Sequence, residues 1–270
     1  MKYAAHSIIV MFVGMLLSAQ GALVLSYDAA DLDLSGDAAG VNWAPAVSNG
    51  VSGMNFNLGA GSSVITPSSS YFSRSVSSPN SGNILSFKNA GYGSNATSDF
   101  SFEIWVKPTD LTSTNILFET GGTTIGTSIL LVNDTLHFVY STGGSPAADV
   151  TGVLASAPSD FIQIVGVTDV SAGLTLYVNG APVNSASTTV GNWAGANGGH
   201  FGGTDSNVAK PAGFIPTDYD GELALARFYD TALSSTEVAA VYTSTSPEPA
   251  TLGLIAFGGS IIFIRRRLMM

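Results

Sequence analysis

The sequence contains no cysteine in 270 residues, which excludes disulfide bonds, thiolate catalysis and cysteine-ligated metal. Histidine is scarce too, and only His137 and His200 lie beyond the first 22 residues, so we expect no zinc site. The Gly-x-Ser-x-Gly nucleophile elbow and the Gly-Lys-Ser/Thr phosphate loop are also missing. These absences remove the common signatures of serine hydrolases and nucleotide-binding enzymes.

Charge is sparse and strongly unbalanced. Only 10% of the residues are charged, and residues 23–246 carry 18 Asp and Glu against 5 Lys and Arg, a net charge of −13. The phosphates of nucleic acids and anionic lipids would repel such a region, so we expect neither as a partner.

The first 22 residues have the pattern of a secretory signal peptide. Lys2 supplies the positive start, Ile8 to Leu17 form a ten-residue apolar stretch, and Ala19-Gln20-Gly21 offers small residues to a signal peptidase. An N-terminal membrane anchor is the alternative, but ten apolar residues are too few to span a bilayer comfortably. We therefore predict cleavage after Gly21 or Ala22.

The C-terminus has a second targeting pattern. Pro247-Glu248-Pro249 is followed by an apolar run from Leu252 to Ile264 and then by Arg265, Arg266 and Arg267. As a helix, the 14 residues from Thr251 to Ile264 would rise about 21 Å, which is short against a hydrocarbon core of about 30 Å. The arginines are expected to stay on the cytoplasmic side, leaving the rest of the chain outside.

This combination resembles the PEP-CTERM sorting signal of bacterial exported proteins. The resemblance implies that an exosortase, a membrane transpeptidase, recognises Pro247, Glu248 and Pro249 and cuts near them. Residues 244–270 are accordingly predicted to insert transiently into the membrane and to be retained there by Arg265, Arg266 and Arg267. The mature protein is then expected at the cell envelope, the cell surface or the extracellular matrix. An ordinary tail anchor is the alternative.

Between these ends the hydrophobic pattern has a period of two, which predicts strands. In the segment 100–107, Phe100, Phe102, Ile104 and Val106 share one face, while Ser101, Glu103, Trp105 and Lys107 share the other. Further strands are predicted at 129–132, 136–140, 161–167, 174–178 and 222–229, with a turn at Asn179-Gly180. Ser234 and Glu237 form a capping box that predicts one short helix near 235–242. The pattern predicts a single all-β sandwich over residues 23–243.

Three segments carry a second resemblance. Phe100-Ser-Phe-Glu-Ile-Trp-Val-Lys-Pro, Leu174-Thr-Leu-Tyr-Val-Asn-Gly and Gly221-Glu-Leu-Ala-Leu-Ala-Arg-Phe-Tyr resemble, in order and spacing, the strands of laminin-G-like domains. The resemblance implies a concanavalin A-like jelly roll of two antiparallel sheets. Ala224-Leu225 stand where that family usually has Asp-Glu, so this chain lacks those two acids.

Acidic residues are candidates for two kinds of site. Asp218, Asp220 and Glu222 alternate, so on a strand they would share one face, as the acid and nucleophile of a glycan hydrolase require. The alternative is a loop leading into the strand. Many laminin-G-like domains bind calcium, and oxygen ligands suit that ion, so Asp218, Asp220, Glu222, Asp28 and Asp169 are candidate calcium ligands.

For sugar binding, Trp105 and Trp193 are the candidates, because aromatic rings stack on pyranose faces. Trp193 lies in a loop rich in Gly and Asn, and Trp105 lies on the polar face of its predicted strand. Packing in the core or at a sheet edge is the alternative for both. The sequence as a whole predicts an exported, non-enzymatic recognition module for carbohydrate, such as a polysaccharide. A glycan-active hydrolase and a structural matrix protein without a specific ligand are the alternatives.

Overall fold

The computed structural model describes residues 23–32, 36–37, 39–48, 55–79, 99–143, 145–193, 198–203 and 207–245. The predicted signal peptide, the Pro-Glu-Pro motif, the apolar run and the arginine cluster lie outside these residues. The described strands are β1 (Leu23–Asp28), β2 (Gly36–Asp37), β3 (Asn42–Trp43), β4 (Val47–Ser48), β5 (Phe56–Asn57), β6 (Ser63–Ile65), β7 (Ser75–Ser77), β8 (Phe100–Pro108), β9 (Thr114–Gly121), β10 (Ile125–Val132), β11 (Thr135–Thr142), β12 (Ser145–Val153), β13 (Ile162–Asp169), β14 (Gly173–Val178), β15 (Ala181–Ala186), β16 (Gly199–His200) and β17 (Gly221–Tyr229). A short 3-10 helix, η1 (Ala29–Asp31), follows β1, and α1 (Ser235–Thr245) follows β17.

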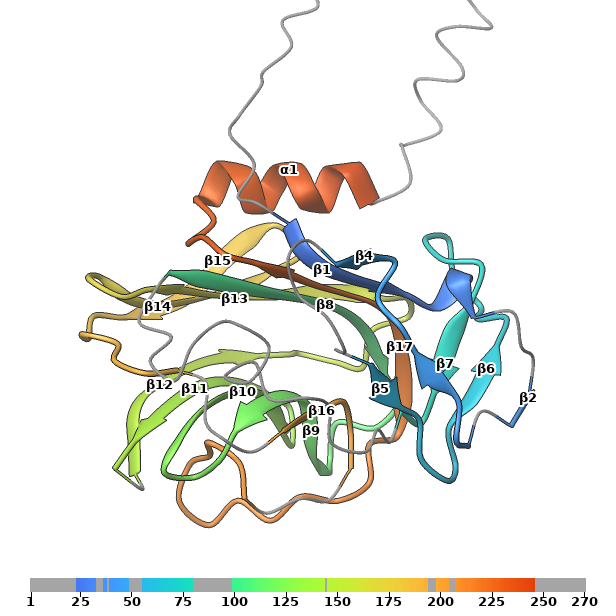
Figure 1. The fold of residues 1–270 in the computed structure, drawn as a ribbon, viewed down its shortest axis with the longest axis horizontal. Coiled ribbons are helices and arrows are strands. Elements are labelled where there is room, and N and C mark those ends of the chain that lie inside the picture. Colours follow the sequence, from blue (N-terminus) through green and yellow to red (C-terminus); the bar gives the residue numbers. More distant parts are fainter. Residues whose placement is uncertain are drawn as a thin grey trace, which may run out of the picture.

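Two antiparallel sheets pack face to face (Figure 1). The larger sheet has the order β15-β14-β13-β8-β17-β7-β6-β2, with β1 and β4 joined to it through β17. The smaller sheet has the order β12-β11-β10-β9-β16. The predicted jelly-roll sandwich of two antiparallel sheets is confirmed.

Strand β8 is at the centre of the larger sheet because one of its faces is entirely apolar. It pairs with β13 and with β17, so Ile104 lies between Ile164 and Ala226. Its inward side chains, Phe100, Phe102, Ile104 and Val106, are buried in the core between the sheets together with aromatic residues of the smaller sheet. Burial of this apolar area is the main driving force for closing the sandwich.

The outer face of β8 is also buried, although its sequence is polar. Helix α1 lies across this face of the larger sheet (Figure 1), and Tyr242 of α1 stacks on Trp105 with ring centroids 5.7 Å apart. Tyr71 and Phe72 cover the other side of Trp105. The predicted helix is confirmed, and it extends three residues beyond its predicted end to Thr245.

A long connection covers the outer face of the smaller sheet in a similar way. Val208, Ala209 and Phe214 of this connection pack on apolar side chains of β9, β10 and β11. Both sheets are therefore shielded on their outer faces over their central strands. No described helix is long and apolar enough to cross a membrane.

The predicted turn at Asn179-Gly180 forms as expected. Asn179 has a φ of +50° and Gly180 a φ of +77°, the left-handed conformations that an Asn-Gly hairpin turn requires, and they join β14 to β15. Asn133, with a φ of +55°, begins the turn between β10 and β11. Short turns of this kind fix the register of each hairpin.

Candidate functional site

Both tryptophans that the sequence suggested for sugar stacking are buried. The side chain of Trp105 is 0% exposed, and its indole N–H donates to the carboxylate of Glu103 over 2.7 Å. Trp193 is 2% exposed, and its ring centroid lies 4.0 Å from that of Phe100 in the core. Neither ring offers a free face to a sugar. Both tryptophans are packed inside the protein, which was the alternative to sugar binding.

The three alternating acids do not share one strand face. Asp218 and Asp220 lie exposed in the connection that precedes β17, and only Glu222 lies in the strand. The Glu222 carboxylate accepts a hydrogen bond of 2.6 Å from Ser75 and lies 3.9 Å from the Lys107 ammonium. Through these contacts Glu222 links β17 to Ser75 of β7 and Lys107 of β8. Asp218 and Asp220 lie in a loop that leads into the strand, as the alternative interpretation predicted.

The other two candidate calcium ligands each close a turn. Asp28 accepts from the backbone of Ala30 at the start of η1. Asp169, at the end of β13, accepts from the backbone and hydroxyl of Ser171 and from the backbone of Ala172. Among the described residues, no three acids or histidines are grouped so that they could hold a metal ion. Calcium binding stays a prediction, which a comparison of melting temperatures in calcium and in EDTA would test.

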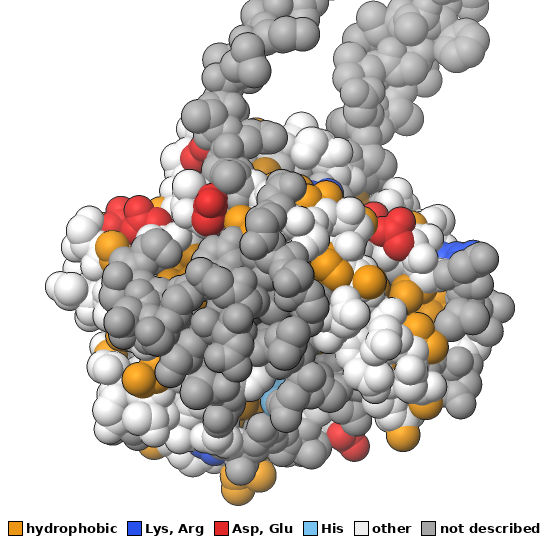
Figure 2. Space-filling model, viewed as in Figure 1, with side chains coloured by type: hydrophobic (Ala, Val, Ile, Leu, Met, Phe, Trp, Pro, Cys, Tyr) orange, Lys and Arg blue, Asp and Glu red, His pale blue; other side chains and the backbone are white. Residues whose placement is uncertain are grey.

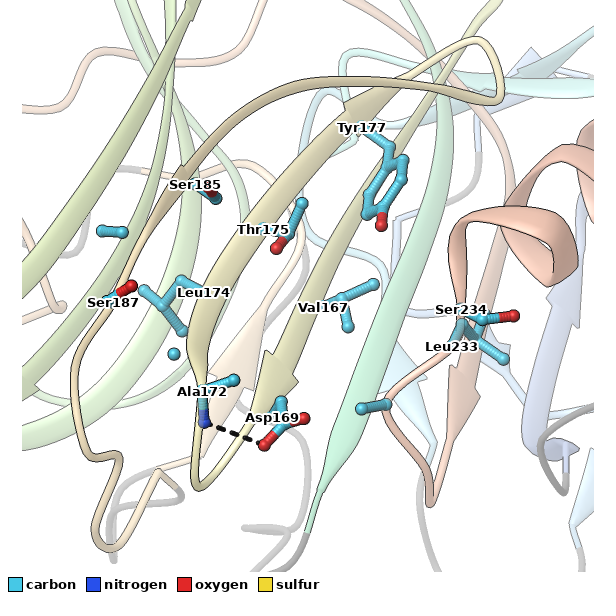
Figure 3. Close-up of a pocket in the computed structure, with 13 residues that line it drawn as sticks. Val167, Asp169, Ala172, Leu174, Thr175, Tyr177, Ser185, Ser187, Leu233 and Ser234 are labelled. Atoms are coloured by element: carbon cyan, nitrogen blue, oxygen red, sulfur yellow. Dashed lines mark hydrogen bonds between the residues drawn. The ribbon is translucent and has the colours of Figure 1, made fainter.

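The structure brings Asp169 into a groove that the sequence did not reveal (Figure 3). The groove encloses about 470 Å³ on the outer face of the larger sheet, where β13, β14 and β15 meet the segment that leads into α1. Six of its thirteen described lining residues have polar side chains. They are Asp169, Thr175, Tyr177, Ser185, Ser187 and Ser234.

Strand register places the floor of this groove. Val167 pairs with Thr175, and Thr175 pairs with Ser185, so these three side chains form one cross-strand row. Leu174 and Leu176 of the same strand point into the core, because side chains alternate along a strand. The alternation therefore turns Thr175 and Tyr177 outward.

A glycine closes one end of the groove. Gly173 follows the turn that Asp169 caps, and it has a φ of +119°. A Cβ atom at this position would lie 2.1 Å from the backbone oxygen of Ala186, so only glycine permits this approach. The close contact holds the end of β15, and with it Ser187, beside the Asp169 turn.

The ionisable groups of the groove have settled protonation states at neutral pH. Hydrogen bonds from the Ser171 hydroxyl and backbone, and from the Ala172 backbone, lower the pKa of Asp169. Burial raises the pKa of Tyr177, which keeps its hydroxyl neutral. In the part of the chain that the structure describes, the groove thus holds one anionic carboxylate among neutral hydroxyls, and no lining residue there is Lys, Arg or His.

The surroundings of the groove are acidic as well. The capping box at the start of α1 places the Glu237 carboxylate 2.7 Å from the hydroxyl and 2.8 Å from the backbone nitrogen of Ser234, a lining residue. On the face shown in Figure 2, acidic side chains gather at several places near the larger sheet, while basic side chains are few.

Comparison with known families agrees with this architecture. Residues 80–239 match the family described as the concanavalin A-like lectin/glucanases superfamily (Laminin_G_3). The chain belongs to this superfamily. A search of curated protein sequences gives no match to it.

Solved structures with this concanavalin A-like fold include toxin binding domains. The binding domain of Paraclostridial Mosquitocidal Protein 1 is 14% identical, with a TM-score of 0.58 over 82% of this chain and 52% of the other. The binding domain of Botulinum neurotoxin DC in complex with rat synaptotagmin II is 14% identical, with a TM-score of 0.54 over 83% and 51%. The same domain in complex with SialylT is 12% identical, with a TM-score of 0.54 over 83% and 51%. The chain spans about half the length of these proteins, and the likeness shows the fold alone.

Sequence reasoning missed three further polar features of this concanavalin A-like domain. Each described histidine pairs with an acid: His137 Nδ1 lies 2.9 Å from a carboxylate oxygen of Asp149, and His200 Nδ1 bonds to Glu119. A second cavity of about 230 Å³ lies over the smaller sheet and is lined in part by Lys210. The alternation in residues 174–178 was the available signal for the groove, since it already placed Thr175 and Tyr177 on one face.

Proposed function

We propose that this chain is an exported, non-catalytic carbohydrate-binding module whose ligand occupies the groove beside α1. The observation that carries the proposal is the set of hydroxyl groups around one ordered carboxylate in a concave site of about 470 Å³. This volume falls within the range of small-molecule sites, about 300–1,000 Å³. Membership of a superfamily named for lectins and glucanases supports the same class of ligand.

The groove can bind a sugar mainly through hydrogen bonds. Hydroxyl groups both donate and accept, so Thr175 and Ser185 can match the hydroxyls of a sugar in either sense. The hydroxyl of Tyr177 stays protonated and can donate, while the Asp169 carboxylate only accepts. The apolar side chains of Val167 and Leu233 offer the contact that the C–H faces of a pyranose need.

Titration of the full-length protein with glycans selected on an array tests this site. We expect Thr175→Val to weaken binding about tenfold, the effect of one lost hydrogen bond in a desolvated site. Thr151→Val is the matched control, because this half-buried threonine lies on β12 of the opposite sheet. Equal affinity of the two variants would place the binding site elsewhere. Silence of the whole array would favour the structural matrix protein.

The exposed positions of Asp218 and Asp220 before β17 do not favour the hydrolase. A retaining glycosidase needs two carboxyl groups about 5 Å apart and facing one bond. Hydrolysis assays on the bound glycans are expected to show no turnover. Turnover that is lost in Glu222→Gln would overturn the non-catalytic assignment.

We also propose that the chain is exported and then processed at Pro247-Glu248-Pro249 by an exosortase-type enzyme. The support lies in the sequence: residues 1–22 have a signal-peptide pattern, and Pro247-Glu248-Pro249 precedes an apolar run and three arginines. Mass spectrometry of the mature protein is expected to show a chain that begins near residue 22 and ends near 247. An intact Met270 would contradict the sorting signal.

A further inference from the structure

The charges of the groove indicate which chemical class of sugar it takes. Among the described residues, its lining contains one ionised side chain, Asp169, and no cation. Arg227, on the outer face of β17, is directed elsewhere, since its guanidinium donates to Thr245 and lies 3.6 Å from Glu103. No described basic side chain of β17 therefore neutralises the groove.

The Asp169 carboxylate is already oriented for a ligand. Its Oδ1 accepts three hydrogen bonds, of 2.7 Å from the Ser171 hydroxyl and 2.9 Å from the backbones of Ser171 and Ala172. Figure 3 shows the second oxygen pointing away from Ala172. Because the turn fixes the side chain, a ligand donor can meet Oδ2 with little further loss of rotamer entropy.

The start of α1 offers no compensating site for an anion. A helix N-terminus usually attracts anions through its free N–H groups and its dipole. Here the Glu237 carboxylate occupies that position and accepts from the Ser234 backbone and hydroxyl. A carboxylated or sulfated sugar beside Ser234 would therefore face two carboxylates, Asp169 and Glu237.

We infer that the groove binds an amine-bearing glycan more tightly than its neutral counterpart and rejects the carboxylated one. The Asp169 carboxylate is the group that discriminates between these charges. The inference rests on the proposed carbohydrate-binding function. A protonated sugar amine would donate to Asp169 Oδ2 in a charge-assisted hydrogen bond, which is stronger than the bond from a hydroxyl. A uronate at the same place would bring two anions together.

Three hexasaccharides with the same β-1,4 linkage and length provide the test: glucosamine is cationic through its C2 amine, glucose is neutral, and glucuronic acid is anionic through its C6 carboxylate. Isothermal titration uses the full-length protein in EDTA, so that no divalent cation bridges ligand and carboxylate. The pH is about 6, between the pKa ranges of carboxyl and amine groups. We expect the glucosamine oligomer to bind about tenfold more tightly than the glucose oligomer, and the glucuronate oligomer to bind least.

Asp169→Asn is the decisive variant. Asparagine retains Oδ1 and hence the turn, but it carries no charge, so the preference for glucosamine over glucose is expected to disappear. Asp149→Asn removes the same charge from the opposite sheet and is expected to keep that preference. Tight binding of the glucuronate oligomer, or an unchanged preference in Asp169→Asn, would overturn this inference while leaving carbohydrate binding intact. Absence of binding by all three oligomers, together with silence of the whole glycan array, would instead refute the proposed function.

Discussion

Glu103 is a fully buried carboxylate beneath α1, and its removal should destabilise the whole sandwich. The side chain is 0% exposed. It accepts from the Trp105 indole over 2.7 Å, from the Gln163 amide over 2.9 Å and from the Tyr229 hydroxyl over 2.8 Å. The Arg227 guanidinium lies 3.6 Å away and supplies a positive charge.

The expected cost follows from these partners. Glu103→Ala leaves three buried donors without an acceptor, which costs about 1–3 kcal/mol for each donor. Water that enters the new cavity can accept from some of these donors and so reduces the total cost. Removal of one partner from a buried ion pair costs about 3–5 kcal/mol in other proteins. We therefore expect the free energy of unfolding to fall by about 3–5 kcal/mol. Tyr229→Phe deletes one donor and should cost only about 1 kcal/mol.

Urea unfolding followed by tryptophan fluorescence measures both effects, because Trp43, Trp105 and Trp193 are all buried and will shift on unfolding. Asp149→Ala is the surface control, since its pair with His137 is partly exposed and should contribute less than about 1 kcal/mol. A loss below about 1 kcal/mol in Glu103→Ala would refute the reasoning. It would mean that water or rearranged side chains replace the carboxylate at little cost.

Three other perturbations follow from single positions. Gly173→Ala should cost about 3 kcal/mol or more in urea unfolding, because its Cβ would lie 2.1 Å from a backbone oxygen of β15. Gly213→Ala, with a φ of +80° and no atom near its Cβ, should cost only about 1 kcal/mol; equal costs would contradict the clash. Burial opposes ionisation of Asp160, but hydrogen bonds from the Ser69–Ser70 segment and Phe161 prevail and lower its pKa. Its contribution to stability is thus present above about pH 4 and lost as the pH falls through the lowered pKa, so urea midpoints of Asp160→Asn and wild type should differ at neutral pH and converge in acid. Burial raises the pKa of Tyr27, so the unfolded chain loses that proton first and stability should fall above about pH 10; a flat alkaline unfolding profile would contradict this.

Local pattern predicted the strands well and their surroundings poorly. The alternation in residues 100–107 gave the correct inward face of β8, because period two is a property of the strand itself. The same pattern placed Trp105 on the polar face of the strand, but Tyr242, which lies 137 positions further along the chain, covers that face. The Glu and Trp of the Phe-x-Phe-Glu-Ile-Trp motif are thus partners in one buried network. A hydrophobic period cannot show that a distant helix supplies the cover.

The candidate site was harder to predict for a related reason. The alternating acids 218–222 suggested a shared strand face, but β17 begins at Gly221, and the first two acids precede it. Asp169 was selected as a calcium ligand by residue type alone. Its neighbours Ser185 and Ser234 come from separate parts of the chain. They meet only because β13, β14 and β15 pair with one another and the segment before α1 lies beside them.

The position of the groove follows from how the sandwich shields its outer faces. Helix α1 covers the larger sheet over β8, β13 and β17, where Trp105 and Val165 would otherwise meet water. Val208 and Phe214 do the same for the smaller sheet. Strand β15, by contrast, is an edge strand that is exposed along most of its length. The outer face of β14 beside it carries Thr175, which needs no apolar cover. A polar groove can therefore persist beside the start of α1, next to the area that the helix covers, and a ligand bound there would extend the cover of the outer face.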